Sequence, residues 1–153
     1  MEVRDLYGKG LDYPFIIEAG QIRTTEYEAK INAALRMLFD TDVGERFMNP
    51  AYGCRLKRLL FEQDSETFEI MARQYIESAI EIWEPRVQRI VDIKFDYENK
   101  ETRRTPVGGD ESRIWPGFHS SMGQGAQVVN IIVEYELIGS QVVSNFVYPF
   151  ISM

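Results

Sequence analysis

Acidic side chains are the residues of this 153-residue chain that could do the most chemistry. Two carboxyl groups that face each other across a cleft, one of them with a raised pKa, can hydrolyse a glycosidic bond. The candidates near turns and helix ends are Glu45, Glu62, Asp64 and Glu84. Glu45 precedes Arg46 and Glu84 lies two residues before Arg86, and a nearby guanidinium lowers the pKa of a carboxyl group, which is the wrong direction for a general acid. The pattern favours polar corners, and a peptidoglycan-cleaving, muramidase-like hydrolase stays as the alternative.

Other catalytic and ligand-binding groups are sparse. The only histidine, His119, stands beside Ser120 and Ser121, and neighbours in sequence do not make a triad without an orienting acid. The only cysteine, Cys54, is expected to be a partly buried structural residue. One histidine and one cysteine cannot form a zinc site, and the carboxylates lack the spacing of a calcium loop. The sequence therefore predicts no catalytic residue, no cofactor and no metal.

Composition restricts the class of protein. The chain is 44% hydrophobic and 27% charged, which is typical of a single globular domain with a real core. Its net charge of −7 argues against nucleic acid and anionic lipid as partners and favours a partner with basic patches. A single cysteine, no signal peptide and no apolar run long enough to span a bilayer predict a cytoplasmic protein without membrane insertion.

The first half of the chain reads as mostly helical. Residues 1–13 are expected to form an extended arm, and residues 13–17 a short strand that begins at Pro14. Apolar residues at helical spacing predict a helix over 26–39, with Thr25 and Glu28 as a capping box. Turn-forming residues predict a loop, or a small hairpin, over 40–60. The clearest periodicity predicts a helix over 65–83, capped within residues 64–66.

The second half reads as strands. Val91, Ile93, Phe95 and Tyr97 alternate with polar residues and are expected on one core-facing side of a strand. A second strand covers 129–137 with a turn at Gly139-Ser140, and a third covers 142–151. Together these elements predict an α+β fold in which two main helices pack on one face of a mainly antiparallel sheet, as a single domain over 1–153.

Residues 99–127 form a loop insertion between two predicted strands, rich in charge, glycine and serine. The segment is too long for an idle hairpin turn, and Trp115 and Phe118 inside it indicate that it orders on a partner. A ligand-binding module that uses these two aromatic residues is therefore a further alternative.

The two halves meet at Trp83-Glu84-Pro85-Arg86. Pro85 should end the helix at Glu84 or one residue earlier and direct Arg86 into an extended segment. A carboxylate at this end faces the negative end of the helix dipole unless a cation answers it, and Arg86 stands two residues away. Glu84 and Arg86 are therefore expected to form a rigid polar corner, which either binds a partner or serves only to cap the helix.

Several motifs in a fixed order resemble a known family. They are Gly44-Glu45-Arg46, Asn49-Pro50-Ala51-Tyr52-Gly53-Cys54, Leu59-Leu60-Phe61-Glu62 and Trp83-Glu84-Pro85-Arg86. Over about Tyr13 to Leu137 the chain is similar to the small baseplate-wedge, sheath-initiating proteins of contractile phage tails and related injection systems, including the type VI secretion baseplate. Some relatives have been called lysozymes, and nothing in this sequence supports that activity.

The resemblance implies a structural role in a contractile particle and no enzymatic activity. It assigns Glu84, Pro85 and Arg86 to the helical core bundle of the larger wedge proteins, and it adds Glu45 and Arg46 as partner-binding residues. It also implies that the sheet receives strands from sheath subunits of the first ring, while inner tube or hub proteins are further candidate contacts.

The last predicted strand fits this role. It is apolar on both faces, and such a strand at an open sheet edge invites pairing with another chain. Val143, Phe146 and Tyr148 are its expected partner-binding residues. The alternative is that the strand is central and covered by its own sheet.

Overall fold

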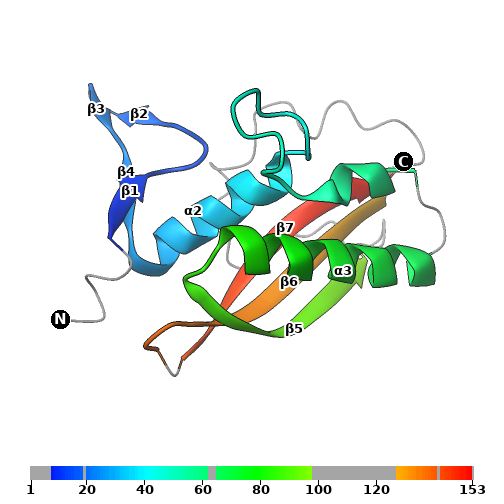
Figure 1. Cartoon of the computed structure of the whole chain (residues 1–153). Helices are drawn as coiled ribbons and strands as arrows, with labels where there is room; N and C mark the ends of the chain where they lie inside the picture. The colour runs from blue at the N-terminus through cyan, green and yellow to red at the C-terminus, as the bar shows by residue number, and fades with distance from the viewer. Residues whose placement is uncertain (1–7, 19, 62–64, 98–126, 141, 153) are drawn as a thin grey trace.

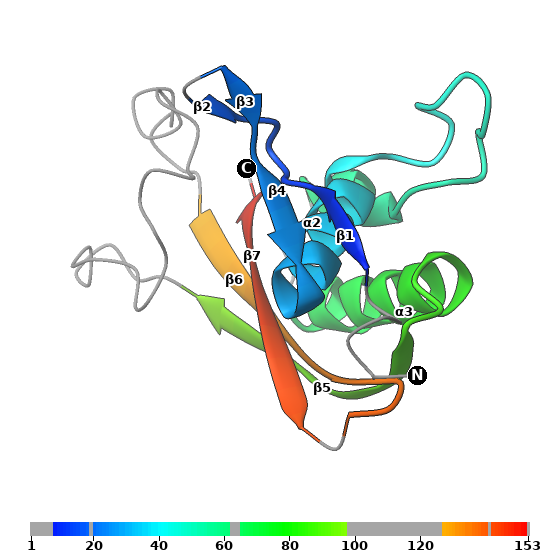
Figure 2. The ribbon, with the colours of Figure 1, turned by 90° about the vertical axis from the view of Figure 1, so that its left-hand side faces the viewer.

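The computed structural model describes residues 8–18, 20–61, 65–97, 127–140 and 142–152. At its centre is an antiparallel sheet of three strands in the order β5 (Val87–Tyr97), β6 (Gln127–Leu137) and β7 (Val143–Ser152). Two helices, α2 (Tyr27–Asp40) and α3 (Ser65–Trp83), cover one face of this sheet (Figures 1 and 2). This arrangement confirms the predicted α+β class.

The helix α3 has the bounds that its apolar periodicity predicts. Its buried face packs on β5 and β6, and every predicted inward residue of β6 is buried in the same core: Val129, Ile131, Val133, Tyr135 and Leu137. These elements were predictable because each carries a long, unbroken period. The predicted turn at Gly139 is also present, with a φ of 81° and a hydrogen bond from the Ser140 amide to the Leu137 carbonyl.

The entry to α2 differs from the predicted capping box. Thr25 belongs to β4 (Thr24–Glu26), which pairs with β1 (Lys9–Leu11), and its hydroxyl is buried without a hydrogen-bond partner among the described residues. Glu28 accepts a hydrogen bond from Ser144 of β7 at 2.8 Å instead of capping the helix. Pairing with β1 therefore keeps the chain extended up to Glu26, and the capping geometry cannot form.

The predicted strand over 13–17 is also wrong. Only Ile17 of these residues is in a strand, since β2 (Ile17–Glu18) forms a short hairpin with β3 (Gln21–Ile22). Asp12 accounts for the difference, because its carboxylate accepts the Tyr13 amide and pairs with Arg23 at 3.2 Å. Pro14 has no amide hydrogen to give to a ladder, so pairing resumes beyond it.

The strand β5 contains two irregularities, and the second of them, at Val91, leaves this side chain exposed instead of on the predicted core-facing side. The register shifts between Val87 and Arg89 and again between Ile90 and Asp92. Each bulge inserts a residue and changes the alternation, so Ile93 is buried while Val91 is exposed. Strict alternation over 91–97 could not reveal these shifts, because bulges depend on the partner strand.

The strand β7 lies at an edge of the sheet. Among the described residues it pairs with β6 alone, so it is not the covered central strand of the alternative. Between α2 and α3 the described residues 41–61 form turns and a 3-10 helix, η1 (Arg55–Leu59), and no hairpin. Several candidates lie outside the described residues: Glu62, Asp64, Trp115, Phe118, His119, Ser120 and Ser121.

The register of β6 gives the first prediction. Ile131 is fully buried against the helices, and its neighbour Ile132 is half-buried on the opposite face. We expect Ile131→Ala to lower the free energy of unfolding by about 2–5 kcal/mol, because it leaves a cavity in the core. Ile132→Ala, the matched control, should cost less than half as much in urea unfolding. Equal losses for the two variants would contradict the assigned inner face.

Candidate docking corner and its supporting loop

The corner over Glu84–Arg86 is a tight turn that joins α3 to β5. The Glu84 amide still donates to the Ile80 carbonyl at 2.9 Å, and the Val87 amide then closes the turn by donating to the Glu84 carbonyl at 3.0 Å. The Arg86 carbonyl accepts from the Ile138 amide at 3.0 Å, which ties the corner to the β6–β7 turn. Pro85 is exposed at the tip. The main chain thus fixes this corner at both ends.

The side chains of the corner form a two-pronged ion pair. Arg86 donates from Nε to Glu84 Oε1 at 2.5 Å and from Nη2 to Oε2 at 2.6 Å. Glu84 is only 4% exposed, whereas the Arg86 side chain is 27% exposed. The hydrogen bonds to Glu84 raise the pKa of Arg86. The carboxylate is therefore buried within the monomer, and Arg86 is the group that covers it.

A stack of three side chains connects the corner to the loop before η1. The guanidinium carbon of Arg46 lies 3.7 Å from the centre of the Tyr52 ring, which is a close cation–π contact. Tyr52 in turn packs edge-on against Trp83, with ring centres 5.3 Å apart. Partial burial raises the pKa of the Tyr52 hydroxyl. The stack thereby places the two arginine-bearing motifs at 44–46 and 83–86 in one structural unit.

Tyr52 is the residue of this unit that the sequence analysis did not assign. A tyrosine in a proline–glycine turn and the tryptophan that ends α3 are a plausible pair, but more than thirty residues separate them in the chain. Only the fold brings them into contact.

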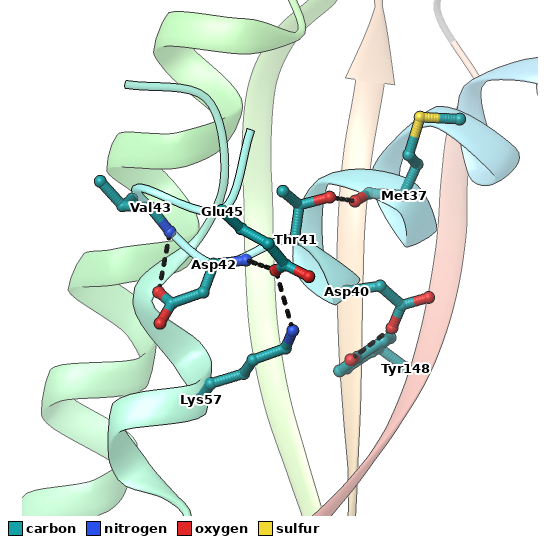
Figure 3. Close-up of polar contacts among 8 residues, drawn as sticks. All are labelled: Met37, Asp40, Thr41, Asp42, Val43, Glu45, Lys57 and Tyr148. Carbon is teal, nitrogen blue, oxygen red and sulfur yellow. Dashed lines mark hydrogen bonds and ion pairs between the residues drawn. The ribbon is translucent and has the colours of Figure 1, made fainter. Parts of the chain in front are cut away.

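Glu45 secures the base of the same loop (Figure 3). Its Oε2 accepts hydrogen bonds from the Asp42 amide at 2.8 Å and from Lys57 Nζ at 3.1 Å. The hydrogen bond from the Asp42 amide contributes most to lowering the pKa of Glu45, and the hydrogen bond from Lys57 contributes next. The direction agrees with the sequence-based expectation, but the cause is different, because Arg46 turns to Tyr52 and to the sulfur of Met37 instead.

Gly53 closes the loop where no other residue fits. Its φ is 131°, and a Cβ at this position would lie 2.5 Å from the Thr41 carbonyl oxygen. The Cys54 amide donates to this same oxygen at 2.9 Å, so the two ends of the loop touch. The backbone conformation of this loop therefore requires a glycine at position 53.

The β7 residues of the predicted site form a separate group. Val143 is exposed on the outer face of the sheet, whereas Phe146 is buried against Phe39. Tyr148 is half-buried and donates to Asp40 at 2.7 Å (Figure 3). The side chain of Phe146 is thus committed to the core, whereas that of Tyr148 stays partly exposed.

The described residues offer little for catalysis. They contain no cluster of three or more histidine, cysteine or acidic side chains that could hold a metal. Cys54 is buried, and burial raises the pKa of its thiol to about 12, so this group is not a nucleophile near neutral pH. The side-chain oxygens of Glu45 and Glu84 both accept hydrogen bonds from neighbouring donors.

A comparison with known protein families identifies the family of this chain. Residues 25–106 match the profile of the family described as Baseplate wedge protein gp25, and the chain belongs to this family. It is thus a structural component of a baseplate, where it associates with other baseplate components. A search of curated proteins found no significant match.

Two solved structures share the fold. One is described as a candidate tail lysozyme from Geobacter sulfurreducens, with a TM-score of 0.56 and 21% identity over 84% of this chain and 94% of that chain. The other is a chain of the anti-feeding prophage baseplate, with a TM-score of 0.58 and 24% identity over 66% of this chain and 81% of that chain. Within the part of the chain that the structure describes, no helix is long and apolar enough to cross a membrane.

Burial of Glu84 inside the monomer gives the second prediction. We expect Arg86→Met to lower the free energy of unfolding by about 2–4 kcal/mol, because it leaves a buried carboxylate without its cation. Adding Glu84→Gln to that variant should recover at least about 1 kcal/mol, since the charge is then gone. A complete double-mutant cycle in urea measures this coupling. Additive losses would show that the pair does not contribute to stability as a unit.

Proposed function

We propose that this protein is a baseplate wedge component of a contractile injection particle, and that it connects the larger wedge proteins to the first sheath ring. The observation that carries the proposal is the corner itself, in which one arginine both neutralises a buried carboxylate and reaches the surface. Family membership and the fold shared with a chain of the anti-feeding prophage baseplate support the setting.

Arg86 is suited to bind a second protein. Its Nε and Nη2 are used by Glu84, while Nη1 makes no hydrogen bond to any described residue. The guanidinium is thus fixed in position by its own chain and keeps donors for carboxylates or for carbonyl groups at a helix end. Such prepositioning lowers the entropy cost of docking onto a bundle of helices. Exposed Pro85 gives the contact a rigid tip.

A lysine substitution separates docking from folding. Arg86→Lys keeps a cation for Glu84 but removes the fork of donors, so we expect a folded monomer and a loss of at least about tenfold in incorporation into baseplates. Arg89→Lys is the matched control, because Arg89 makes the same two-pronged pair with Glu136, both bonds at 2.8 Å, on the exposed face of the sheet.

Incorporation is measured by quantitative mass spectrometry of purified baseplates, with circular dichroism as the folding control. If Arg86→Lys is incorporated as well as Arg89→Lys, the corner is not the docking element.

The two edges of the sheet differ in how open they are. At the β5 edge the Ile93 amide donates to the Asp92 side chain at 2.8 Å, and the Ile93 carbonyl accepts from Arg73 at 2.6 Å. Two bulges further distort this strand. Bulges and charged side chains are devices that protect an edge from pairing. No described side chain hydrogen-bonds to the main chain of β7, so β7 is the better edge for an added strand.

The surroundings of β7 leave room for such a strand. A hollow of about 210 Å³ lies between the middle of β7, the outer face of α2 and the Asp12–Tyr13 bend. Its α2 side is lined by two small residues, Ala29 and Ala33, and by two polar ones, Asn32 and Arg36. We infer that sheath subunits of the first ring supply the strand, and that inner tube or hub proteins are at most secondary contacts.

Matched lysine substitutions test which edge is used. Val147 on β7 and Val91 on β5 are both 44% exposed. A charge on an edge strand opposes the addition of another strand. We therefore expect Val147→Lys to give baseplates that contain the protein but carry sheath at least about tenfold less often, while Val91→Lys leaves sheath assembly unchanged. For each variant, electron microscopy of negatively stained particles counts the baseplates and the fraction of them that carry sheath. The reverse pattern would assign the β5 edge, and normal sheath on both would exclude strand addition.

A hydrolase is the less supported function, although one similar structure is described as a candidate tail lysozyme. A general acid needs a raised pKa, whereas the pKa of Glu45 is lowered by the Asp42 amide and Lys57. Glu84 is enclosed by the fork of Arg86. Neither residue lines the hollow along α3 or the hollow beside β7.

A further inference from the structure

The loop between α2 and η1 carries the two most exposed large apolar side chains of the described residues. Phe47 is 96% exposed and Met48 is 89% exposed. Figure 2 shows this loop reaching away from the helices and the sheet. We call Phe47 and Met48 the apolar tip. The contacts that form the docking corner and the β7 edge do not include the tip. Arg46 and Tyr52 lie on either side of it and connect to the corner only through the contact of Tyr52 with Trp83.

The loop holds the apolar tip in a defined position. The Gly44 amide donates to the Pro50 carbonyl at 2.7 Å, and the Tyr52 amide donates to the Asn49 carbonyl at 3.1 Å. Arg46, immediately before the tip, is fixed on the Tyr52 ring. An exposed aromatic on a loop that is already ordered loses little conformational entropy on binding. Such residues are typical binding hot spots.

The charges near the apolar tip nearly balance, but two cations of η1 are left without an ion pair within the described part of the chain. Residues 40–61 contain four cations (Arg46, Arg55, Lys57 and Arg58) and three anions (Asp40, Asp42 and Glu45). Lys57 pairs with Glu45, whereas Arg55 and Arg58 form no ion pair with a described residue. Arg55 and Arg58 lie three apart in η1 and are exposed, while Leu56 and Leu59 are buried beneath them. Lys57 reaches Glu45, two residues before Phe47, which places η1 beside the loop.

Neither of two hollows on the described surface offers a second copy of this chain a fitting site for the tip. One hollow on the described surface runs along α3 and is lined mainly by charged side chains, including Glu66, Glu69, Arg73 and Glu77. The hollow beside β7 is lined by Asp12, Asn32, Arg36 and Asn145 among others. Both are too polar to receive a phenylalanine and a methionine.

We propose that the apolar tip and η1 together form a third docking surface, which inserts Phe47 into an apolar pocket on a different protein of the same particle, with acidic residues at the rim of that pocket. Charge complementarity orients the contact, and the two apolar side chains supply most of its affinity. This proposal rests on the proposed function in one respect: it places the contact inside a contractile particle.

Site-specific photo-cross-linking identifies the partner surface. The photoreactive residue benzoylphenylalanine replaces Phe47 in the full chain, and Ile70 in the control, since Ile70 is exposed on α3 away from the loop. Purified particles are irradiated, and the cross-linked peptides are sequenced. We expect position 47 to cross-link at least about tenfold more than position 70, to one peptide of another protein that contains apolar residues and at least two acidic ones. Cross-links to a second copy of this chain, or equal yields at both positions, would overturn the proposal.

A serine pair measures what the apolar tip contributes. We expect Phe47→Ser with Met48→Ser to leave the melting temperature unchanged and to lower incorporation into particles at least about tenfold, while Ile70→Ser has no effect. If Arg86→Lys reduces incorporation but the serine pair does not, the docking corner stands and the apolar tip is overturned. Sedimentation with vesicles of phosphatidylcholine and phosphatidylserine tests a lipid surface instead. Vesicle binding that the serine pair abolishes would also overturn the proposal.

Discussion

The pair formed by Glu84 and Arg86 is the constraint on which the rest of this structure depends. A carboxylate at the C-terminal end of a helix faces the negative end of the helix dipole, and here it is also removed from water. Both costs are acceptable only because a guanidinium two residues away makes two hydrogen bonds to it. Pro85 between them sets the turn that makes this geometry possible. The end of α3, the start of β5 and the position of the charge are therefore one feature.

The two edges of the sheet differ, because the β5 edge is closed and the β7 edge is open. The Arg73 and Asp92 side chains satisfy the main chain of β5 at Ile93, and the bulges distort that edge. No described side chain hydrogen-bonds to the main chain of β7, which contributes Phe146 and Phe150 to the core. Pro149 removes one donor from this strand, since proline has no amide hydrogen. An edge that is needed for folding cannot be removed or disordered, and pairing with a partner strand, as proposed, would protect it from aggregation.

The parts of the fold that were predictable from sequence are those in which one period decides the structure. Helix α3 and strand β6 have long regular patterns, and both were placed correctly. The predictions failed where long-range pairing outweighed local preference. Thr25 is a good helix cap in isolation, but it pairs with β1 and lies in a strand. The bulge before Asp92 leaves Val91 exposed instead of on the core-facing side.

The candidate site, like the fold, could be predicted from sequence only where local patterns decide the structure. The residue types at 83–86 indicated a polar corner, because a proline, an acid and an arginine at that spacing have a local meaning. The burial of Glu84 within its own chain depends on contacts between distant segments. The same is true of the connection from Arg46 through Tyr52 and Trp83 to the corner. The apolar tip begins at the residue after Arg46, so the stack of Arg46, Tyr52 and Trp83 links the tip to the corner. If a partner binds both the apolar tip and the corner, as proposed, the first contact orients the second and lowers its entropy cost.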